Sequence, residues 1–568
     1  MGSTVPAPDL AFEAVNLESI ADPGLRRCFA QLLNLVEVQA TEIRVLRAEN
    51  QRLRDEIARL KGEQGRPHFP GRSKSDKSPG SRKHSSEKER KEPKKWRKEG
   101  KLIPVDREET CTVDQSALPD DAEFKGHTRF VVQDVLFRTD NVLFYREKFY
   151  SPSEGKTYLA PLPAGYDGGE FGPGLISYVL TQYFIANTSG PKILEMLRNR
   201  GIILSEGQLS NILTKEHEKF HQEKAEVFAA GIESTPWQQI DDTITRIDGV
   251  AHHCHVLGNV LYSIFATLPG KDRLSVLDVL RGGAGRAFLY NDMARVLAET
   301  FGVSGSILEQ LEPLSLCLEL GESKFRQAIR RCAPGINERQ LEWVLQASAI
   351  AEYHDQDAIP VIRSVLTDDA RQFRWLVEEH ALCWIHEGRH FKKLTPVLRV
   401  FQEAREEFLG KFWDFYRQLR AYRETPTAYK AKRLERKFDK LFNTVTPYVE
   451  LNERIALTRA KKSELLLVLK HPELPLHNND SELSARQRVR KRDVSFGPRS
   501  SAGARCWDTF QSLVATAKKL GINAYEYIED RVRDAGRVPR LAAVIAERAA
   551  ALNLGASWQS WPLPRPSS

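Results

Sequence analysis

The chain has 568 residues, too many for one ordinary core, so several structural units are expected. Its 84 Lys and Arg residues exceed its 76 Asp and Glu residues and give a net charge of +8, distributed very unevenly along the chain. Seven scattered cysteines without a Cys-x-x-Cys pair argue against a disulfide framework and a zinc ribbon. With no leader pattern and no run of eighteen apolar residues, we expect a soluble, cytoplasmic chain without a membrane partner.

Residues 1–23 are expected to be disordered, and residues 24–62 then follow a seven-residue repeat of apolar side chains. Such a repeat, sustained over about five heptads in a polar segment, predicts a coiled coil that joins two copies of the chain. The alternative is a single amphipathic helix packed on its own domain. Asn50 at the seam favours a parallel, two-stranded register. The expected interface residues are Leu32, Val36, Ile43, Leu46, Asn50, Leu53, Ile57 and Leu60.

Residues 63–101 are rich in Lys, Arg, Ser, Pro and Gly, with almost no apolar side chains, which predicts a disordered basic linker. A solvated tether and a loose, salt-sensitive contact with phosphates are equally compatible with this composition. In residues 102–168, β-branched and aromatic residues alternate with polar ones, as in TRFVVQDVLF and NVLFYREKFYS. This alternation predicts a small β-rich unit.

Residues 169–232 have helical periodicity and include two short helices separated by Gly201, Ile202 and Ile203. Ser205, three residues before Gln208, is a suitable N-cap for a second helix that starts near Glu206. The pattern resembles a helix-turn-helix, although ordinary helical pairs are more common than DNA-reading ones. If the second helix reads DNA, the side chains expected at bases or phosphates are Gln208, Ser210, Asn211 and Lys215.

Three acidic residues in separate segments could together bind divalent metal ions. Asp241 falls in or at the end of the first strand of a predicted β-meander that turns at Asp248-Gly249. Asp368 directly follows the apolar run IPVIRSVLT, and Glu482 lies where a polar loop enters a helix. Carboxylates suit two Mg²⁺ or Mn²⁺ ions, which at about 4 Å separation promote in-line phosphoryl displacement. Taken singly, an acidic residue at a strand end is more often a solvated or capping group than a metal ligand.

A basic segment follows Glu482 and is expected to hold DNA phosphates close to the metals. The alternative is that these basic residues form a solvated face of a helix without a DNA contact. The residues concerned are Arg486, Arg488, Arg490, Lys491 and Arg492.

At four segments the chain resembles the transposases of the insertion sequence 66 family, a branch of the DDE transposases with an RNase H-like catalytic domain. The longest of them contains an Asn-Asn-x-x-Glu core, a basic helix and a Phe-Gly turn. The four segments are IDDT (240–243), LTDD (366–369), CWIHEGRHFKKL (383–394) and HNNDSELSARQRVRKRDVSFGPRSSAGARCWDTFQSLVATAKKLGINAYEYI (477–528).

The resemblance implies that Asp241, Asp368 and Glu482 are the catalytic, metal-binding acids. Asp242 and Asp369 remain the alternatives at the first two positions. Two Mg²⁺ or Mn²⁺ ions per site are expected.

Family members often carry a cysteine-rich zinc module after the zipper, whereas the matching region here has only Cys111, so no zinc is expected. Cys383 and His386 have metal-like spacing but lack a second pair nearby, so we interpret them as part of a structural helix. Arg389 on the same segment is a candidate DNA contact.

The expected fold class is multidomain α+β. An N-terminal coiled coil, a β-rich unit and a helix-turn-helix region precede an RNase H-like α/β catalytic domain at 233–535. Helical insertions are expected at about 276–357 and 396–470, and a C-terminal helix and tail at 536–568.

These features together predict a DNA transposase that cleaves the ends of an insertion sequence and joins them to target DNA. The expected partners are double-stranded DNA in the nucleoid, a second copy of the chain, and accessory proteins encoded by the same element. Two other functions fit the same residues: a metal-dependent nuclease without strand transfer, and a catalytically inactive DNA-binding regulator derived from a transposase.

Overall fold

The computed structural model describes residues 17–60, 105–114, 118–119, 122–135, 137–163, 166, 169–316 and 321–558. The predicted basic linker at 63–101 lies outside the described residues, as do most of the N-terminal segment expected to be disordered and the last ten residues of the tail. No helix in the described ranges is long and apolar enough to cross a membrane.

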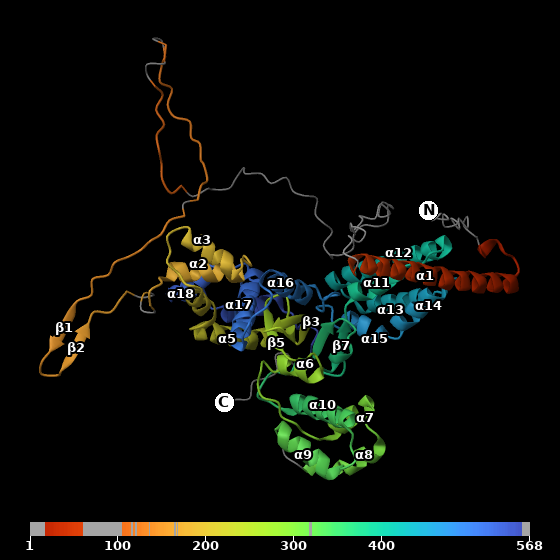
Figure 1. Cartoon of the computed structure of the whole chain (residues 1–568). Coiled ribbons are helices and arrows are strands. Elements are labelled where there is room, and N and C mark those ends of the chain that lie inside the picture. Colours follow the sequence, from red (N-terminus) through yellow and green to blue (C-terminus); the bar gives the residue numbers. More distant parts are fainter. Residues whose placement is uncertain are drawn as a thin grey trace.

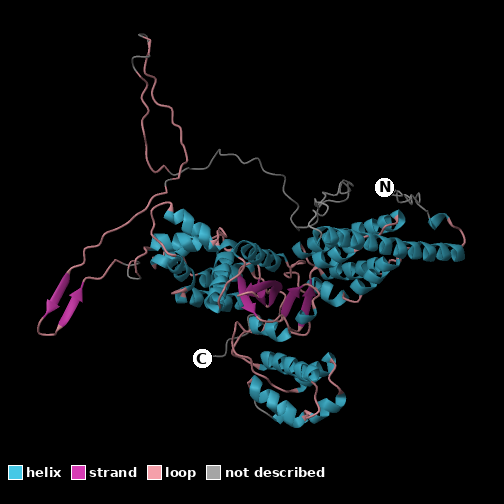
Figure 2. Ribbon diagram, in the orientation of Figure 1, coloured by secondary structure: helices cyan, strands magenta, loops and turns pink. Residues whose placement is uncertain are grey.

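A five-stranded sheet lies at the centre of the molecule, with its strands in the order β5-β4-β3-β6-β7 (Figure 2). The strands β5, β4 and β3 pair antiparallel, whereas β3, β6 and β7 pair parallel. The protein is therefore a mixed α+β structure. The strands are β3 (Trp237–Ile247), β4 (Val250–Gly258), β5 (Ser263–Leu268), β6 (Ser364–Thr367) and β7 (Glu379–Leu382).

The tight turn between β3 and β4 is formed by Asp248 and Gly249, as the sequence predicts. Both residues have positive φ, 48° and 78°, the conformation that favours Asp-Gly in a two-residue hairpin. The resulting register sets Asp241 opposite Val256 and Asp242 opposite His255. Since cross-strand partners share a face of the sheet, Asp241 and Asp242 project to opposite faces.

Helices cover both faces of the sheet. On one face α16 (Asn479–Ser495) and α17 (Ser501–Lys519) pack against β3, β4 and β5. Val256 belongs to the small core on this side, so Asp241 also faces α16 and α17. On the other face lies α6 (Arg273–Leu280), where the core includes Leu257.

The connection from β5 to β6 forms a helical lobe that hangs below the sheet in Figure 1. Its own apolar core is continuous with the α6 side of the sheet. The lobe falls within the range expected to be an insertion. Its helices after α6 are α7 (Asp292–Phe301), α8 (Gly305–Gln310), α9 (Glu322–Cys332) and α10 (Glu338–Asp355), with a 3₁₀ turn at Glu312–Leu316.

A second helical lobe follows β7 and lies beside the sheet (Figure 1). Aromatic side chains fill its core around Trp384, whose ring contacts Phe412, Phe415 and Phe438. Its helices are α11 (Trp384–Lys393), α12 (Arg399–Glu424), α13 (Ala428–Phe442), α14 (Val449–Arg459) and α15 (Lys462–Leu465).

The heptad segment forms one continuous helix, α1 (Pro23–Leu60), which packs along this second lobe (Figure 1). Leu33 enters the lobe's core, and the buried Glu37 carboxylate accepts backbone hydrogen bonds from Val397 and Leu398, just before α12. The Asn34 amide donates to the carbonyl of Pro447 and accepts from the backbone N–H of Val449, at the start of α14. One face of α1 is thus docked within its own chain, while most of the predicted coiled-coil residues stay exposed.

The helical region before the sheet packs against α17 and the C-terminal helices, with which it shares one core. Ser205 and Gln208 form a capping box at the start of α4, which confirms the predicted helix start. The helices are α2 (Pro173–Phe184), α3 (Gly190–Arg198), α4 (Glu206–Thr214), α5 (Glu218–Glu233), α18 (Ala524–Arg533) and α19 (Leu541–Leu552).

The described part of 102–168 differs from the β-rich unit that the sequence predicts. It holds a single hairpin, β1 (Lys148–Ser151) with β2 (Lys156–Leu159), and the run TRFVVQDVLF forms no strand where it is described. Apolar side chains such as Phe130 and Tyr145 are exposed on this arm. The alternating pattern predicts extended backbone, but a compact unit needs a second layer that buries one face, and the described residues supply none.

Candidate active site

Asp241 lies in the middle of β3, on the face that α16 covers. Burial, assisted by repulsion from Asp368, from the adjacent Asp242 and most weakly from Glu482, raises the pKa of Asp241 to about 7. Acids from three distant segments of the chain are therefore close enough to influence one another. Asp242 faces away from them, and its carboxylate is 3.8 Å from the His253 ring on β4.

Asp368 is the first residue after β6, the strand that pairs in parallel with β3. Its carboxylate accepts a hydrogen bond from the backbone of Ala370 at 3.1 Å, and no cation pairs with it among the described residues. The adjacent Asp369 is instead bound by Arg374 and Lys461, which hold its pKa below the usual value despite burial. Of these two adjacent residues, Asp368 is therefore the one whose carboxylate is not paired with a cation among the described residues.

Glu482 lies in the first turn of α16, and two side chains before it fix that turn to β3. The buried Asn478 amide donates to the carbonyl of Ile240 at 2.9 Å, directly beside Asp241. Asp480 exchanges two hydrogen bonds with Gln239, both at 3.2 Å. The start of α16 is thereby held against the middle of β3.

The Glu482 carboxylate is bound by two arginines. Arg389 of α11 reaches both of its oxygens, at 3.0 and 3.2 Å, and Arg486 lies one turn further along α16. Burial tends to raise the pKa of Glu482, but these guanidinium groups hold it below its usual value. Arg389 also donates to Nε2 of His386, whose pKa is lowered by burial and by that arginine, so the ring is neutral at pH 7.

Cys383 links the strands to α16. Its backbone N–H donates to Thr367 at 3.0 Å, and its sulfur accepts from the backbone of Asn478 at 3.4 Å. Burial raises the pKa of the thiol to about 11. Cys383 therefore has a packing and hydrogen-bonding position at the start of α11, in agreement with the structural interpretation of the Cys-x-x-His spacing.

Carboxylate oxygens fit divalent metal ions, and a bound cation would offset both the burial and the weaker repulsion from neighbouring acids that raise the pKa of Asp241. Within the described ranges no three His, Cys, Asp or Glu side chains are yet close enough to hold one ion together. Glu482 is occupied by Arg389, so metal binding at these acids requires that pairing to loosen.

Two of the basic residues expected at DNA phosphates are buried, and for them the expectation is wrong. Arg488 is 0% exposed and pairs with Asp508 of α17, which also accepts from Thr267 on β5. Lys491 is buried against the Tyr183 ring, 3.2 Å from its centroid, and donates to the Tyr183 carbonyl. Both residues lie on the inner face of α16, where a phosphate group has no access.

The other three basic residues of α16 have different positions. Arg486 and Arg490 are exposed on the outer face of the helix. Arg492 is half-buried and donates to the carbonyl of Ile244 on β3. Arg486 and Arg490 therefore follow Glu482 at successive turns on the outer face of α16.

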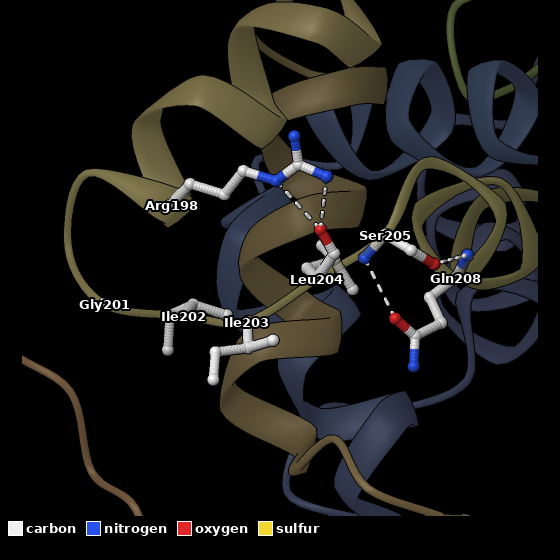
Figure 3. Close-up of a pocket in the computed structure, with 7 residues that line it drawn as sticks. All are labelled: Arg198, Gly201, Ile202, Ile203, Leu204, Ser205 and Gln208. Atoms are coloured by element: carbon white, nitrogen blue, oxygen red, sulfur yellow. Dashed lines mark hydrogen bonds between the residues drawn. The ribbon is translucent and has the colours of Figure 1, made fainter.

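The α3–α4 turn has a shallow hollow lined by residues 198–208 (Figure 3). Arg198 spans it and donates twice to the carbonyl of Leu204. The Gln208 amide is engaged in the capping box and with Glu170, which leaves it poorly placed for reading a base. Asn211 and Lys215 are exposed.

Asn478, Asp480 and Asp508 position the site, although their roles were not predicted from the sequence. The Asn-Asn-x-x-Glu spacing was the available signal for the first two, because side chains just before a helix commonly fix its entry. Asp508 carried no local signal, since its partners lie on α16 and β5.

Comparison with known proteins identifies the family of the chain. A family model described as "Transposase IS66 family" matches residues 368–506, which include Asp368, Arg389 and Glu482. The uncharacterized protein y4jO of Sinorhizobium fredii is 31% identical over 324 residues, which cover 56% of this chain and 99% of that protein. The chain belongs to the transposase IS66 family. Membership of this family indicates that the protein is a transposase. It does not by itself identify the catalytic residues or the reaction steps.

Proposed function

We propose that this IS66 transposase cleaves DNA at the ends of its insertion sequence and transfers those ends to target DNA, with Asp241, Asp368 and Glu482 as the metal-binding acids. The observation that carries the proposal is the raised pKa of Asp241, caused mainly by burial and further by repulsion from Asp368, Asp242 and Glu482. The setting supports an RNase H-like catalytic domain, because Asp241 is on a central strand and Asp368 ends the parallel neighbour.

Divalent ions at these acids would supply activation of the attacking oxygen and stabilisation of the leaving oxygen. The protein's own residues orient the reacting groups. Asn478 and Asp480 hold the first turn of α16 in place, and the exposed Arg486 and Arg490 are positioned to bind the phosphates of the strand being cut.

The proposal includes a dimer in which α1 pairs with α1 of a second copy. Its support is that the repeat residues Leu32, Ile43, Leu46, Leu53 and Ile57 are about half exposed, although α1 already has one docked face. Asn50 is exposed on the same seam, whereas Val36 is half-buried against the lobe. Two joined copies would bring two sites to two element ends.

Additional DNA contacts are proposed at the start of the helical region, through the exposed Asn211 and Lys215. Asn211 lies on α4 and Lys215 is its C-cap, while the buried face of the helix, Leu209 and Leu213, packs into the molecule. The outward face is therefore available to a duplex.

The decisive experiment is strand transfer with labelled element ends and Mg²⁺, comparing the wild type with Glu482→Gln. Cleavage and joining by the wild type, both lost in Glu482→Gln, is the expected result. Cleavage without joining would identify a nuclease, and metal-independent binding without cleavage would identify a regulator. Asp242→Asn is a matched control and should retain both reactions, because Asp242 faces away from the other acids.

A further inference from the structure

Phe496 has a backbone conformation and an exposure that folding does not explain. It is the C-cap of α16, with φ of 58° in the left-handed region, and its side chain is 88% exposed. Glycine usually occupies such a position because a Cβ atom is disfavoured there. An aromatic residue at this point gains no burial in return, since no ring contact or core contact involves it within the described ranges.

The backbone around Phe496 is rigidly held. Before it, Arg492 donates to the carbonyl of Ile244; after it, Gly497 packs so tightly on Arg246 that a Cβ atom there would lie 2.6 Å from the Arg246 carbonyl oxygen. Pro498 then accepts a hydrogen bond from the backbone of Asp248 at 3.0 Å. The end of α16 is thus fixed on both sides to the tip of the β3–β4 hairpin, and the Phe496 ring projects from a firm base.

Exposed arginines lie along α16 between Glu482 and the Phe496 ring. Arg486 and Arg490 are exposed on the outer face of α16 between Glu482 and Phe496, and Arg499 is exposed just beyond. The 14 residues from Glu482 to Phe496 span roughly 21 Å of helix. A DNA duplex advances about 3.4 Å per base pair, so a strand bound along this face with its scissile phosphate at Glu482 reaches Phe496 about six base pairs away.

We propose that Phe496 is an aromatic wedge that stacks on a base displaced from the duplex a few base pairs from the cleaved bond. The inference rests on the proposed function, because it takes the same DNA on the same helix. Apolar side chains inserted at a base step kink the duplex, and base–aromatic stacking compensates for the lost base stacking. The flanking arginines hold the backbone on either side while the ring contacts the base.

The test uses element-end duplexes in which 2-aminopurine, whose fluorescence rises when it is unstacked, replaces single bases at successive positions. Wild-type protein should brighten one or two positions about six base pairs from the cleavage site. Phe496→Gly should abolish that signal and slow cleavage roughly tenfold, whereas Phe496→Trp, which can still stack on a base, should preserve cleavage. Because glycine suits a left-handed residue, Phe496→Gly should unfold at the same temperature as the wild type or higher.

Two controls separate a wedge from other roles. Val494→Ala removes an exposed apolar side chain from the same helix end and should leave the fluorescence signal unchanged. A duplex with an abasic site at the brightened position should restore cleavage by Phe496→Gly, since no base then has to be displaced.

The inference is overturned if the wild type cleaves without brightening any position, or if Phe496→Gly brightens the same position. It is also overturned if Phe496→Gly changes only the oligomeric state, which would assign the ring to a second copy. Failure of the wild type to bind or cleave element ends would instead refute the proposed function itself.

Discussion

Arg389 and Glu482 form a two-point ion pair, with one guanidinium nitrogen 3.0 and 3.2 Å from the two carboxylate oxygens. Because Glu482 is also proposed as a metal ligand, the arginine and the metal compete for it. Removing the arginine should therefore strengthen metal binding, even though it removes a favourable contact from the metal-free protein.

Arg389→Gln is expected to lower the concentration of Mn²⁺ that half-saturates the DNA-free protein by roughly threefold to tenfold, the effect of about 1 kcal/mol. Calorimetric titration measures this directly. Arg486→Gln is the matched control: its pair with Glu482 spans one exposed helical turn, for which about 0.3–0.5 kcal/mol and at most about a twofold change are expected. Weaker metal binding in Arg389→Gln would show that Arg389 supports the ion instead of competing with it.

The raised pKa of Asp241 makes the metal-free protein sensitive to pH. The folded carboxyl has a pKa of about 7 against an ordinary value of 3.8, so between these values the folded state binds more protons than the unfolded chain. Stability due to this group is present at low pH and is lost as pH rises through 7. At pH 8 the ionised group costs on the order of 4 kcal/mol at most.

Asp241→Asn should accordingly raise the melting temperature of EDTA-treated protein by several degrees at pH 8 and by much less at pH 5. Mg²⁺ should raise the melting temperature of the wild type at pH 8 and have little effect on the variant. Asp242→Asn, on the opposite face of the sheet, should give only a small stabilisation and keep the response to Mg²⁺, because Asp242 supplies only part of the repulsion on Asp241. An equal stabilisation by Asp241→Asn at both pH values would mean that charge is not the cause.

Local patterns predicted the elements that carry the site. The turn at Asp248-Gly249 needs only two residues able to adopt positive φ, and the capping box at Ser205 and Gln208 only a four-residue spacing. Asp368 follows a β-rich apolar run that does form a buried strand. In each case the determining interactions lie within a few residues of one another.

Interactions between distant segments explain what the sequence did not reveal. On α16 the inner face carries Ser481, Ser484, Arg488 and Lys491 beside the small Ala485, a helical spacing without the large apolar residues that normally indicate burial. Arg488 is neutralised by Asp508, twenty residues away. Hydrophobic periodicity alone therefore predicts that Arg488 and Lys491 lie on a solvated or DNA-facing surface.

The helix α1 is a related case. Its heptad repeat indicates one apolar seam, but the docked face uses Leu33 and Glu37, which lie outside that seam. Glu37 accepts hydrogen bonds from the backbone directly before α12, about 360 residues further along the chain. Whether the exposed seam binds a second copy stays a prediction.

The two faces of α1 can be separated by substitution. Glu37→Gln should leave one backbone N–H before α12 poorly bonded, at a cost of about 1–3 kcal/mol, and speed hydrogen exchange at Val397 and Leu398 by at least tenfold. The protein should remain dimeric. Glu42→Gln, at an exposed position of the same helix, is the control.

The double variant Ile43→Lys, Leu46→Lys should do the opposite. It places charges on the exposed seam, so sedimentation should show a monomer, while exchange at Val397 and Leu398 stays slow because the docked face is intact. A wild type that sediments as a monomer at all concentrations would contradict the coiled-coil proposal.

The neighbouring residues Arg490 and Lys491 provide a direct test of which face of α16 meets DNA. Arg490 is exposed, whereas Lys491 is buried against Tyr183 and donates to its carbonyl. A contact with one phosphate contributes about 0.9 to the slope of log affinity against log salt concentration. Arg490→Gln should therefore reduce that slope by about one, while Lys491→Met should leave it unchanged. Fluorescence anisotropy with a labelled duplex at several salt concentrations measures both slopes, and a reduced slope in Lys491→Met would place DNA on the face of α16 that is buried here.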